Sequence, residues 1–196
     1  MNNEIPMFFT GNSGVGKSVM IANTLNIMKE QGKILPIFIN MSAQTTSGRT
    51  QQSIEEKLEK KGRGALGPPV NKKLAVFVDD INMPTVETYG AQPPIELLRL
   101  YVERKGMYDR SDWSWKQVHD STVIACAAPP SGGRANITMR FTRRFNMFCL
   151  PEASPGTLTT IFSSILKGFL STGFADKVKD KQEAAIQSTI EIYTKI

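Results

Sequence analysis

The chain has 196 residues, of which 40% are hydrophobic and 21% are charged, and this composition excludes a disordered protein. Twenty-four basic and 18 acidic side chains give a net charge of +6, but the basic clusters lack the interleaved aromatic residues of a base-stacking surface, so nucleic acid is not the expected partner. No apolar run reaches the length of a membrane span and the first residues do not resemble a signal peptide, which predicts a soluble intracellular protein.

The first predicted elements are a strand over 7–10 and a helix over 17–31, which Gly32 is expected to end. Residues 11–18 lie between them and read Gly-Asn-Ser-Gly-Val-Gly-Lys-Ser, a complete G-x-x-x-x-G-K-S phosphate loop. A strand, a glycine-rich turn and a helix N-terminus are the context that this motif requires. The pattern therefore predicts a nucleotide site rather than a chance glycine-rich turn.

The chemistry of this loop follows from its backbone. Amide N–H groups and the helix dipole together attract a polyphosphate, and glycine lets the chain approach the anion closely. We expect Lys17 to reach the β- and γ-phosphates and the Ser18 hydroxyl to hold Mg²⁺. The predicted nucleotide-binding residues are Gly11, Asn12, Ser13, Gly14, Val15, Gly16, Lys17 and Ser18.

Further strands and helices alternate along the chain, which predicts a mostly parallel sheet. A strand over 34–40 contains Pro36, which cannot donate to a ladder, so this strand is expected at a sheet edge. Residues 50–61 are predicted to form a helix and residues 62–73 a loop or hairpin. The apolar run 74–78 is typical of a central strand that is buried on both faces.

The run 74–78 leads directly into Asp79 and Asp80, which is the Walker-B arrangement. Asp79 is predicted to hold the Mg²⁺ that bridges the phosphates, together with Ser18. Asp80 stands where a water-activating base would lie. A strand that ends in a polar turn is common, but two motifs in this order are far more specific than one.

The rest of the chain predicts a helix from Pro93 to Gly106 and strands over 123–127 and 145–150. The two cysteines, Cys126 and Cys149, lie in these two strands without a spacing pattern, so both are expected to be buried thiols rather than a disulfide framework.

The character of the chain changes at Pro151, where helical patterns replace alternating strands. Ser154 and Pro155 are expected to begin a helix that reaches Leu170, and a further helix runs to the end. We therefore expect a nucleotide-binding α/β core over 1–150 and the first part of a helical unit over 151–196. The abrupt start and end are those expected of a fragment of a longer chain.

The chain resembles the AAA+ ring of dynein heavy chains, and more narrowly the third AAA+ module of axonemal dyneins. The resemblance covers nearly the whole chain. It rests on the segments 77–84, 89–99, 129–134 and 140–145, and for the third module also on 42–45 and 67–69.

The resemblance implies an AAA+ core with sheet order 5-1-4-3-2 and helices on both faces, followed by the start of a helical lid. It implies ATP or ADP with Mg²⁺ as cofactors. The module would lie among neighbouring AAA+ modules of one heavy chain and regulate its main motor site. The whole protein would associate with intermediate and light chains and move along microtubules in a cilium or flagellum.

The resemblance also assigns roles to single residues. Arg140 and Arg143 match the region of the arginine finger, which acts on a neighbouring module's nucleotide, although ordinary surface or ion-pair arginines are an equal alternative. Asp80 is one methylene shorter than the usual glutamate, and the first sensor position is occupied by Ala128. These departures predict firm nucleotide binding with slow or absent hydrolysis.

Two other functions fit parts of the sequence. A non-catalytic module that holds ADP permanently would carry the same phosphate loop. A nucleic-acid-remodelling AAA+ ATPase is suggested only by the net charge of +6. A GTPase is unexpected, because Asn71-Lys72-Lys73-Leu74 lacks the acid of the guanine-reading motif.

Overall fold

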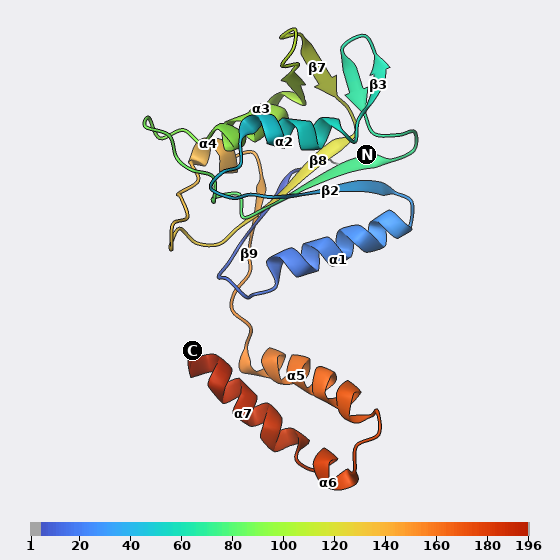
Figure 1. The fold of residues 1–196 in the computed structure, drawn as a ribbon, viewed down its shortest axis with the longest axis vertical. Helices are drawn as coiled ribbons and strands as arrows, with labels where there is room; N and C mark the ends of the chain where they lie inside the picture. The colour runs from blue at the N-terminus through green and yellow to red at the C-terminus, as the bar shows by residue number, and fades with distance from the viewer. Residues whose placement is uncertain (1–4, 196) are drawn as a thin grey trace. The chain divides into compact units, whose positions relative to one another are not determined.

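The computed structural model describes residues 5–195, and the chain divides into two compact units, Met1–Pro151 and Glu152–Ile196. Among the described residues, the first unit is built on a five-stranded parallel sheet (Figure 1). Its strands lie in the order β2 (Ile34–Asn40), β5 (Lys73–Asp79), β8 (Ser121–Ala127), β1 (Met7–Thr10) and β9 (Asn146–Cys149). This order confirms the predicted 5-1-4-3-2 topology.

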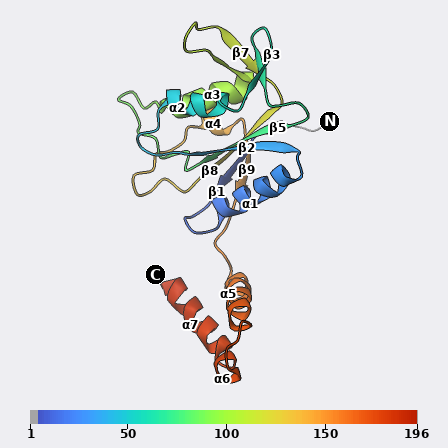
Figure 2. The same cartoon turned by 45° about the vertical axis from the view of Figure 1, so that its right-hand side comes forward.

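Helices cover both faces of this sheet, as both Figure 1 and Figure 2 show. On one face, α1 (Lys17–Glu30) packs Ile21 and Leu25 against the sheet. The other face carries α2 (Ser47–Glu55), α3 (Pro93–Arg104) and the short α4 (Met139–Thr142).

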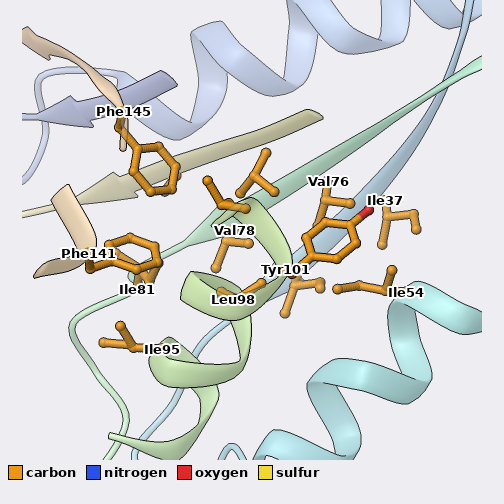
Figure 3. Packing of buried hydrophobic residues seen from close by; sticks show 14 of the residues in the cluster. Ile37, Ile54, Val76, Val78, Ile81, Ile95, Leu98, Tyr101, Phe141 and Phe145 are labelled. Carbon is orange, nitrogen blue, oxygen red and sulfur yellow. The ribbon is translucent and has the colours of Figure 1, made fainter. Parts of the chain in front are cut away.

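The central strand β5 is buried on both faces, as its continuous apolar run predicts. Successive side chains of a strand point to opposite faces. Leu74, Val76 and Val78 therefore join the larger cluster with α2 and α3, whereas Ala75 and Phe77 pack with α1. Figure 3 shows the larger cluster, in which side chains of α2, α3 and α4 meet the strands. The ends of β5 and its neighbours are thus held rigidly.

Strand β2 forms one edge of the sheet and pairs only with β5 among the described residues. Pro36 lies within this strand, where its missing N–H removes no ladder bond to an outer neighbour. The prediction of an edge position for this strand is confirmed.

The predicted helix over 50–61 is wrong in its second half. The helix α2 begins at Ser47, because the Thr46 side chain caps it by accepting from the Arg49 N–H at 3.3 Å, and it ends at Glu55. Residues Glu59–Gly62 instead form β3, which pairs antiparallel with β4 (Ala65–Gly67) across a tight turn. Tertiary pairing has overridden the local helical pattern here.

A second, smaller sheet holds this hairpin, in the order β3, β4, β7 (Trp115–Val118) and β6 (Gly106–Tyr108). The sequence did not predict β6 and β7. The helix α3 ends just before Gly106, the residue expected to end it, with Arg104 as its last residue and Lys105 as its C-cap. Gly106 also serves close packing, because a Cβ there would lie 2.5 Å from the Lys116 carbonyl oxygen.

The second unit contains α5 (Pro155–Leu170), α6 (Asp176–Lys179) and α7 (Gln182–Lys195). Ser154 caps α5, as predicted, by accepting from the Thr157 N–H at 3.2 Å. Leu158 of α5 packs with Ile186 and Ile190 of α7. None of the helices in residues 5–195 is long and apolar enough to cross a bilayer.

The two cysteines differ in exposure. Cys126 on β8 is fully buried, as predicted, but Cys149 on β9 is exposed, so that prediction is wrong. The reason is topological: β9 forms the other edge of the sheet, and every residue of this strand is exposed.

Truncation of the core should be far more costly than truncation of the surface of a helix. Ile54 of α2 is fully buried against the sheet, whereas Ile27 of α1 is 48% exposed. We expect Ile54→Ala to destabilise the α/β unit by about 2–5 kcal/mol and Ile27→Ala by less than about 1 kcal/mol. Hydrogen–deuterium exchange of β2 and β5 in the heavy chain measures this difference. Equal acceleration in both variants would contradict the packing described.

Candidate nucleotide site

The phosphate loop runs from the end of β1 to the start of α1, and two of its glycines are required by geometry. Gly11 has φ 158°, and a Cβ there would lie 2.5 Å from the Leu150 carbonyl oxygen at the end of β9. Gly16 is the N-cap of α1 with φ 86°, a conformation that other residues adopt at a cost of about 1 kcal/mol or more. No side chain caps α1, so its first amides are left to bind an anion.

Lys17 is the first residue of α1 and is only 8% exposed. Its Nζ donates to the carbonyl oxygens of Gly11 and Asn12, at 2.7 Å each. An ammonium group has three N–H donors, so these bonds hold the charge inside the loop and leave one donor for an anion. A buried charge at this position is electrostatically strong because little water screens it.

Asp79 ends β5 at the same edge of the sheet, and the structure ties one of its oxygens down. Asp79 Oδ1 accepts from its neighbour, the Asp80 N–H, at 2.9 Å and from the Cys126 thiol at 2.6 Å. Both bonds use Oδ1 and leave Oδ2 for another ligand. Ser18 Oγ lies 3.9 Å from the same Cys126 sulfur, so the thiol stands between the two predicted metal-binding residues.

Burial, together with the hydrogen bond to Asp79, raises the pKa of the Cys126 thiol to about 12. A raised pKa favours the protonated form at every pH below it, so Cys126 is a neutral thiol and a hydrogen-bond donor at neutral pH. Sequence reasoning assigned no functional role to this residue. The parallel register could have found it, because Val78 pairs with Ala125 and one further step along both strands leads to Asp79 and Cys126.

These elements enclose one pocket, which we call the phosphate-loop pocket. It is lined by Ser13, Gly14, Gly16, Lys17, Ser18, Val19, Asp79, Asp80, Ala128 and Arg134. The structure thus brings both sequence motifs together. Of the predicted loop residues, Gly11, Asn12 and Val15 do not line the pocket. Gly11 and Asn12 contribute carbonyl oxygens to Lys17 instead.

Asp80 has φ 49°, a left-handed conformation that aspartate tolerates better than most residues. Ala128 lines the same pocket, is 6% exposed and can make no side-chain hydrogen bond. The buried Asn82 amide donates to the Ala128 carbonyl oxygen at 2.9 Å. The residue that the resemblance assigns to the first sensor position, Ala128 or its neighbour Ala127, is thus apolar, and the Ala128 backbone is held in place.

Arg134 lines the pocket and is a second residue to which sequence reasoning assigned no role. It follows Gly132 and Gly133, with φ 60° and 85°, in the loop after β8. The next N–H, from Ala135, donates to the Asn82 carbonyl oxygen at 2.9 Å, which anchors this loop beside the strand ends. Arg134 lies within the quoted segment 129–134, but its sequence position alone does not indicate that it lines the pocket.

The two predicted finger residues lie elsewhere. Arg140 belongs to α4 and Arg143 caps it, and neither lines the phosphate-loop pocket. Both side chains are exposed and make no side-chain hydrogen bond or ion pair within residues 5–195. Their neighbour Arg144 differs, because it is paired with Glu103 of α3.

Comparison with known proteins places this site in a family. Residues 1–153 match the family described as the P-loop containing dynein motor region. Human dynein axonemal heavy chain 6 is 48% identical over 190 residues, which is 97% of this chain but 4% of that protein. Rat dynein axonemal heavy chain 12 is 41% identical over 96% of this chain and 6% of its own length.

A third relative is the dynein-1-alpha heavy chain of the flagellar inner arm I1 complex of Chlamydomonas reinhardtii, 40% identical over 96% of this chain and 4% of its own length. The chain thus spans a small part of each of these relatives. The match to the family covers the whole α/β unit, including both motifs of the pocket. This chain belongs to the family of P-loop containing dynein motor regions.

Proposed function

We propose that this chain is an ATP-binding AAA+ module of an axonemal dynein heavy chain, the third of its ring, and that it regulates the motor rather than driving it. The observation that carries this proposal is the meeting of the phosphate loop and the Walker-B carboxylate in one pocket. The relatives are named as axonemal or flagellar dyneins, which supports a place in the axoneme of a cilium or flagellum. The helices of 151–196 would begin the lid.

The loop residues would bind the polyphosphate of ATP or ADP. Amides from Gly14 to Ser18 begin α1 without a side-chain cap, and the Lys17 charge stands among them. The helix dipole, the backbone amides and the ammonium group each attract an anion, and their attractions add at the start of α1. The bound nucleotide would be oriented by its phosphates.

The pocket also fits Mg²⁺. Ser18 and Asp79 both line the pocket and would supply oxygen ligands, and Mg²⁺ usually takes few protein ligands and completes its shell with water and phosphate. When bound, the ion would neutralise charge on the phosphates. The Cys126 thiol would orient Asp79, and the Asp80 N–H would hold the same oxygen.

Hydrolysis at this site is expected to be slow. Asp80 would be the base, but it is short, and the Ala128 methyl cannot orient a water. A misplacement of about 1 Å can cost about 10²-fold in rate. The nucleotide state of this module would then change slowly and tune the other modules, while the complete heavy chain, with intermediate and light chains, moves on microtubules.

A permanently ADP-bound module is the second candidate, and the same apolar sensor position favours it. Extensive dialysis of the heavy chain separates the two. ADP that stays bound and does not exchange with labelled nucleotide would favour the permanent state, whereas exchange favours the regulatory one. Membership of the dynein family favours both over a nucleic-acid-remodelling ATPase.

Removal of the buried charge should abolish binding at this site. In the full-length heavy chain, we expect Lys17→Ala to weaken nucleotide affinity by about 100-fold or more, because charge-assisted bonds to phosphate are lost. Lys29→Ala, an exposed lysine of the same helix, is the control and should change nothing. Fluorescent-nucleotide titration measures both.

Turnover tests the regulatory part separately. The turnover of this module itself is expected to be low already, so Lys17→Ala and Asp80→Asn should each lower this local turnover little. Robust turnover that disappears in Asp80→Asn would show that this module is a working ATPase.

The Cys126 thiol beside Asp79 should raise the affinity of the site for Mg²⁺. Cys126→Ala removes a donor from Asp79 Oδ1, and loss of such an orienting bond typically costs about 10–100-fold in metal affinity. Cys126→Ser keeps a donor and should retain most of it. The Mg²⁺ concentration that half-saturates nucleotide binding measures this effect. Identical Mg²⁺ dependence in the Ala and Ser variants would argue against a positioning role.

The exposed arginines should act on a neighbouring module. We expect Arg140→Ala or Arg143→Ala to lower nucleotide turnover elsewhere in the ring by about 10³-fold at the affected site, and to leave nucleotide affinity here unchanged. Arg104→Ala, another exposed arginine, is the control. Turnover unchanged in both single variants and in the double variant would mean that these are ordinary surface residues.

A further inference from the structure

Arg134 is a pocket residue to which the proposed function gives no role. It lines the phosphate-loop pocket together with Asp79, Asp80 and Ala128 and with the loop residues Lys17 and Ser18. The elements that carry these groups are separate: β5 delivers the two carboxylates, β8 delivers Ala128, and the loop after β8 delivers Arg134.

The backbone around Arg134 is fixed rather than loose. Its own N–H donates to the Ser131 carbonyl oxygen at 3.2 Å, which closes a turn, and the Ala135 N–H is bound by Asn82. Asn82 is buried and also holds Ala128 through its side chain. One asparagine therefore holds both the apolar sensor position and the arginine loop against the end of β5.

The Arg134 guanidinium group has a buried hydrogen-bond donor that lacks an acceptor among the described residues. Its Nε is buried and has no hydrogen-bond partner within residues 5–195, and no ion pair joins Arg134 to Asp79 or Asp80. A buried donor without a partner is costly, and an arginine is always charged. The bond that would satisfy it is one to an anion, and guanidinium groups bind phosphate oxygens by two parallel N–H bonds.

The position of Arg134 indicates which phosphate of the nucleotide it would bind. Lys17 is expected to reach the β- and γ-phosphates from the loop side, and Asp80, the predicted base, would face the terminal phosphate. The Ala128 side chain, which lines the same pocket, offers no donor. Arg134 is the remaining cation of the pocket wall.

We propose that Arg134 binds the γ-phosphate of ATP and so distinguishes ATP from ADP at this site, in place of the polar side chain that Ala128 lacks. This inference rests on the proposed function. Loss of the γ-phosphate would release Arg134, while Lys17 keeps the diphosphate. Asn82 links the arginine loop to the end of β5, so this change would occur beside the strand end. Arg134 would then make the site a sensor of the nucleotide state without requiring fast hydrolysis.

The test measures Mg·ATP and Mg·ADP affinities separately in the full-length heavy chain, with the signal that disappears in Lys17→Ala taken as this site's contribution. Arg134→Met removes the charge but keeps an apolar stem, and Arg134→Lys keeps a charge without the planar fork. Arg63→Met, at an exposed arginine outside the pocket, is the matched control.

We expect Arg134→Met to weaken ATP binding by about 10- to 100-fold, with ADP binding changed by less than about twofold, and Arg134→Lys to fall between Met and wild type. Unchanged ATP affinity, or equal losses for ATP and ADP, would overturn the role of Arg134 and leave the nucleotide site intact. If Lys17→Ala removed no part of the nucleotide-binding signal of the wild type, that result would instead overturn the proposed function itself.

Discussion

The parallel pairing of β1, β5 and β8 is the constraint on which the candidate site depends. Because all three strands point the same way, their carboxyl ends meet at one edge of the sheet. The phosphate loop leaves β1 there, Asp79 leaves β5, and Ala128 leaves β8. The α1 N-terminus and the Lys17 charge therefore face carboxylates that lie far away in the sequence. Burial of β5 on both faces keeps this meeting point rigid. A shift of β5 would disturb the hydrophobic clusters on both faces of the sheet.

Short polar links then connect the ends of β5 and β8. Cys126 of β8 donates to Asp79 of β5, and Asn82, just beyond β5, holds both Ala128 and the loop that carries Arg134. Such links would suit the proposed regulatory site, because they join the pocket to a neighbouring loop. The apolar Ala128 removes a group that would serve the chemical step, but it leaves the arginine beside it.

Much of this could be predicted from the sequence, for identifiable reasons. The phosphate loop and the apolar run before Asp79 are local patterns, and Pro36 placed its strand at an edge through a missing donor. The helix over 50–61 was wrong because pairing of β3 with β4, a contact between segments, outweighed local helical spacing. Strands β6 and β7 stayed hidden because they are short and have little apolar alternation. Strand pairing brings Cys126 to the site, and the course of the loop after β8 brings Arg134 there. Neither role can be recognised from the sequence around the residue alone. Cys149 was misplaced because an apolar run does not tell an edge strand from a central one.

The central claim is that residues 11–18 close around the phosphates of a nucleotide. A structure of the complete heavy chain, determined with Mg²⁺ and a non-hydrolysable ATP analogue at saturating concentration, tests it most directly. The account predicts nucleotide density in this module, with phosphate oxygens within hydrogen-bond distance of the amides from Gly14 to Ser18 and of Lys17 Nζ. A well-ordered module whose loop carries no nucleotide under these conditions, while other modules of the same ring are filled, would contradict it.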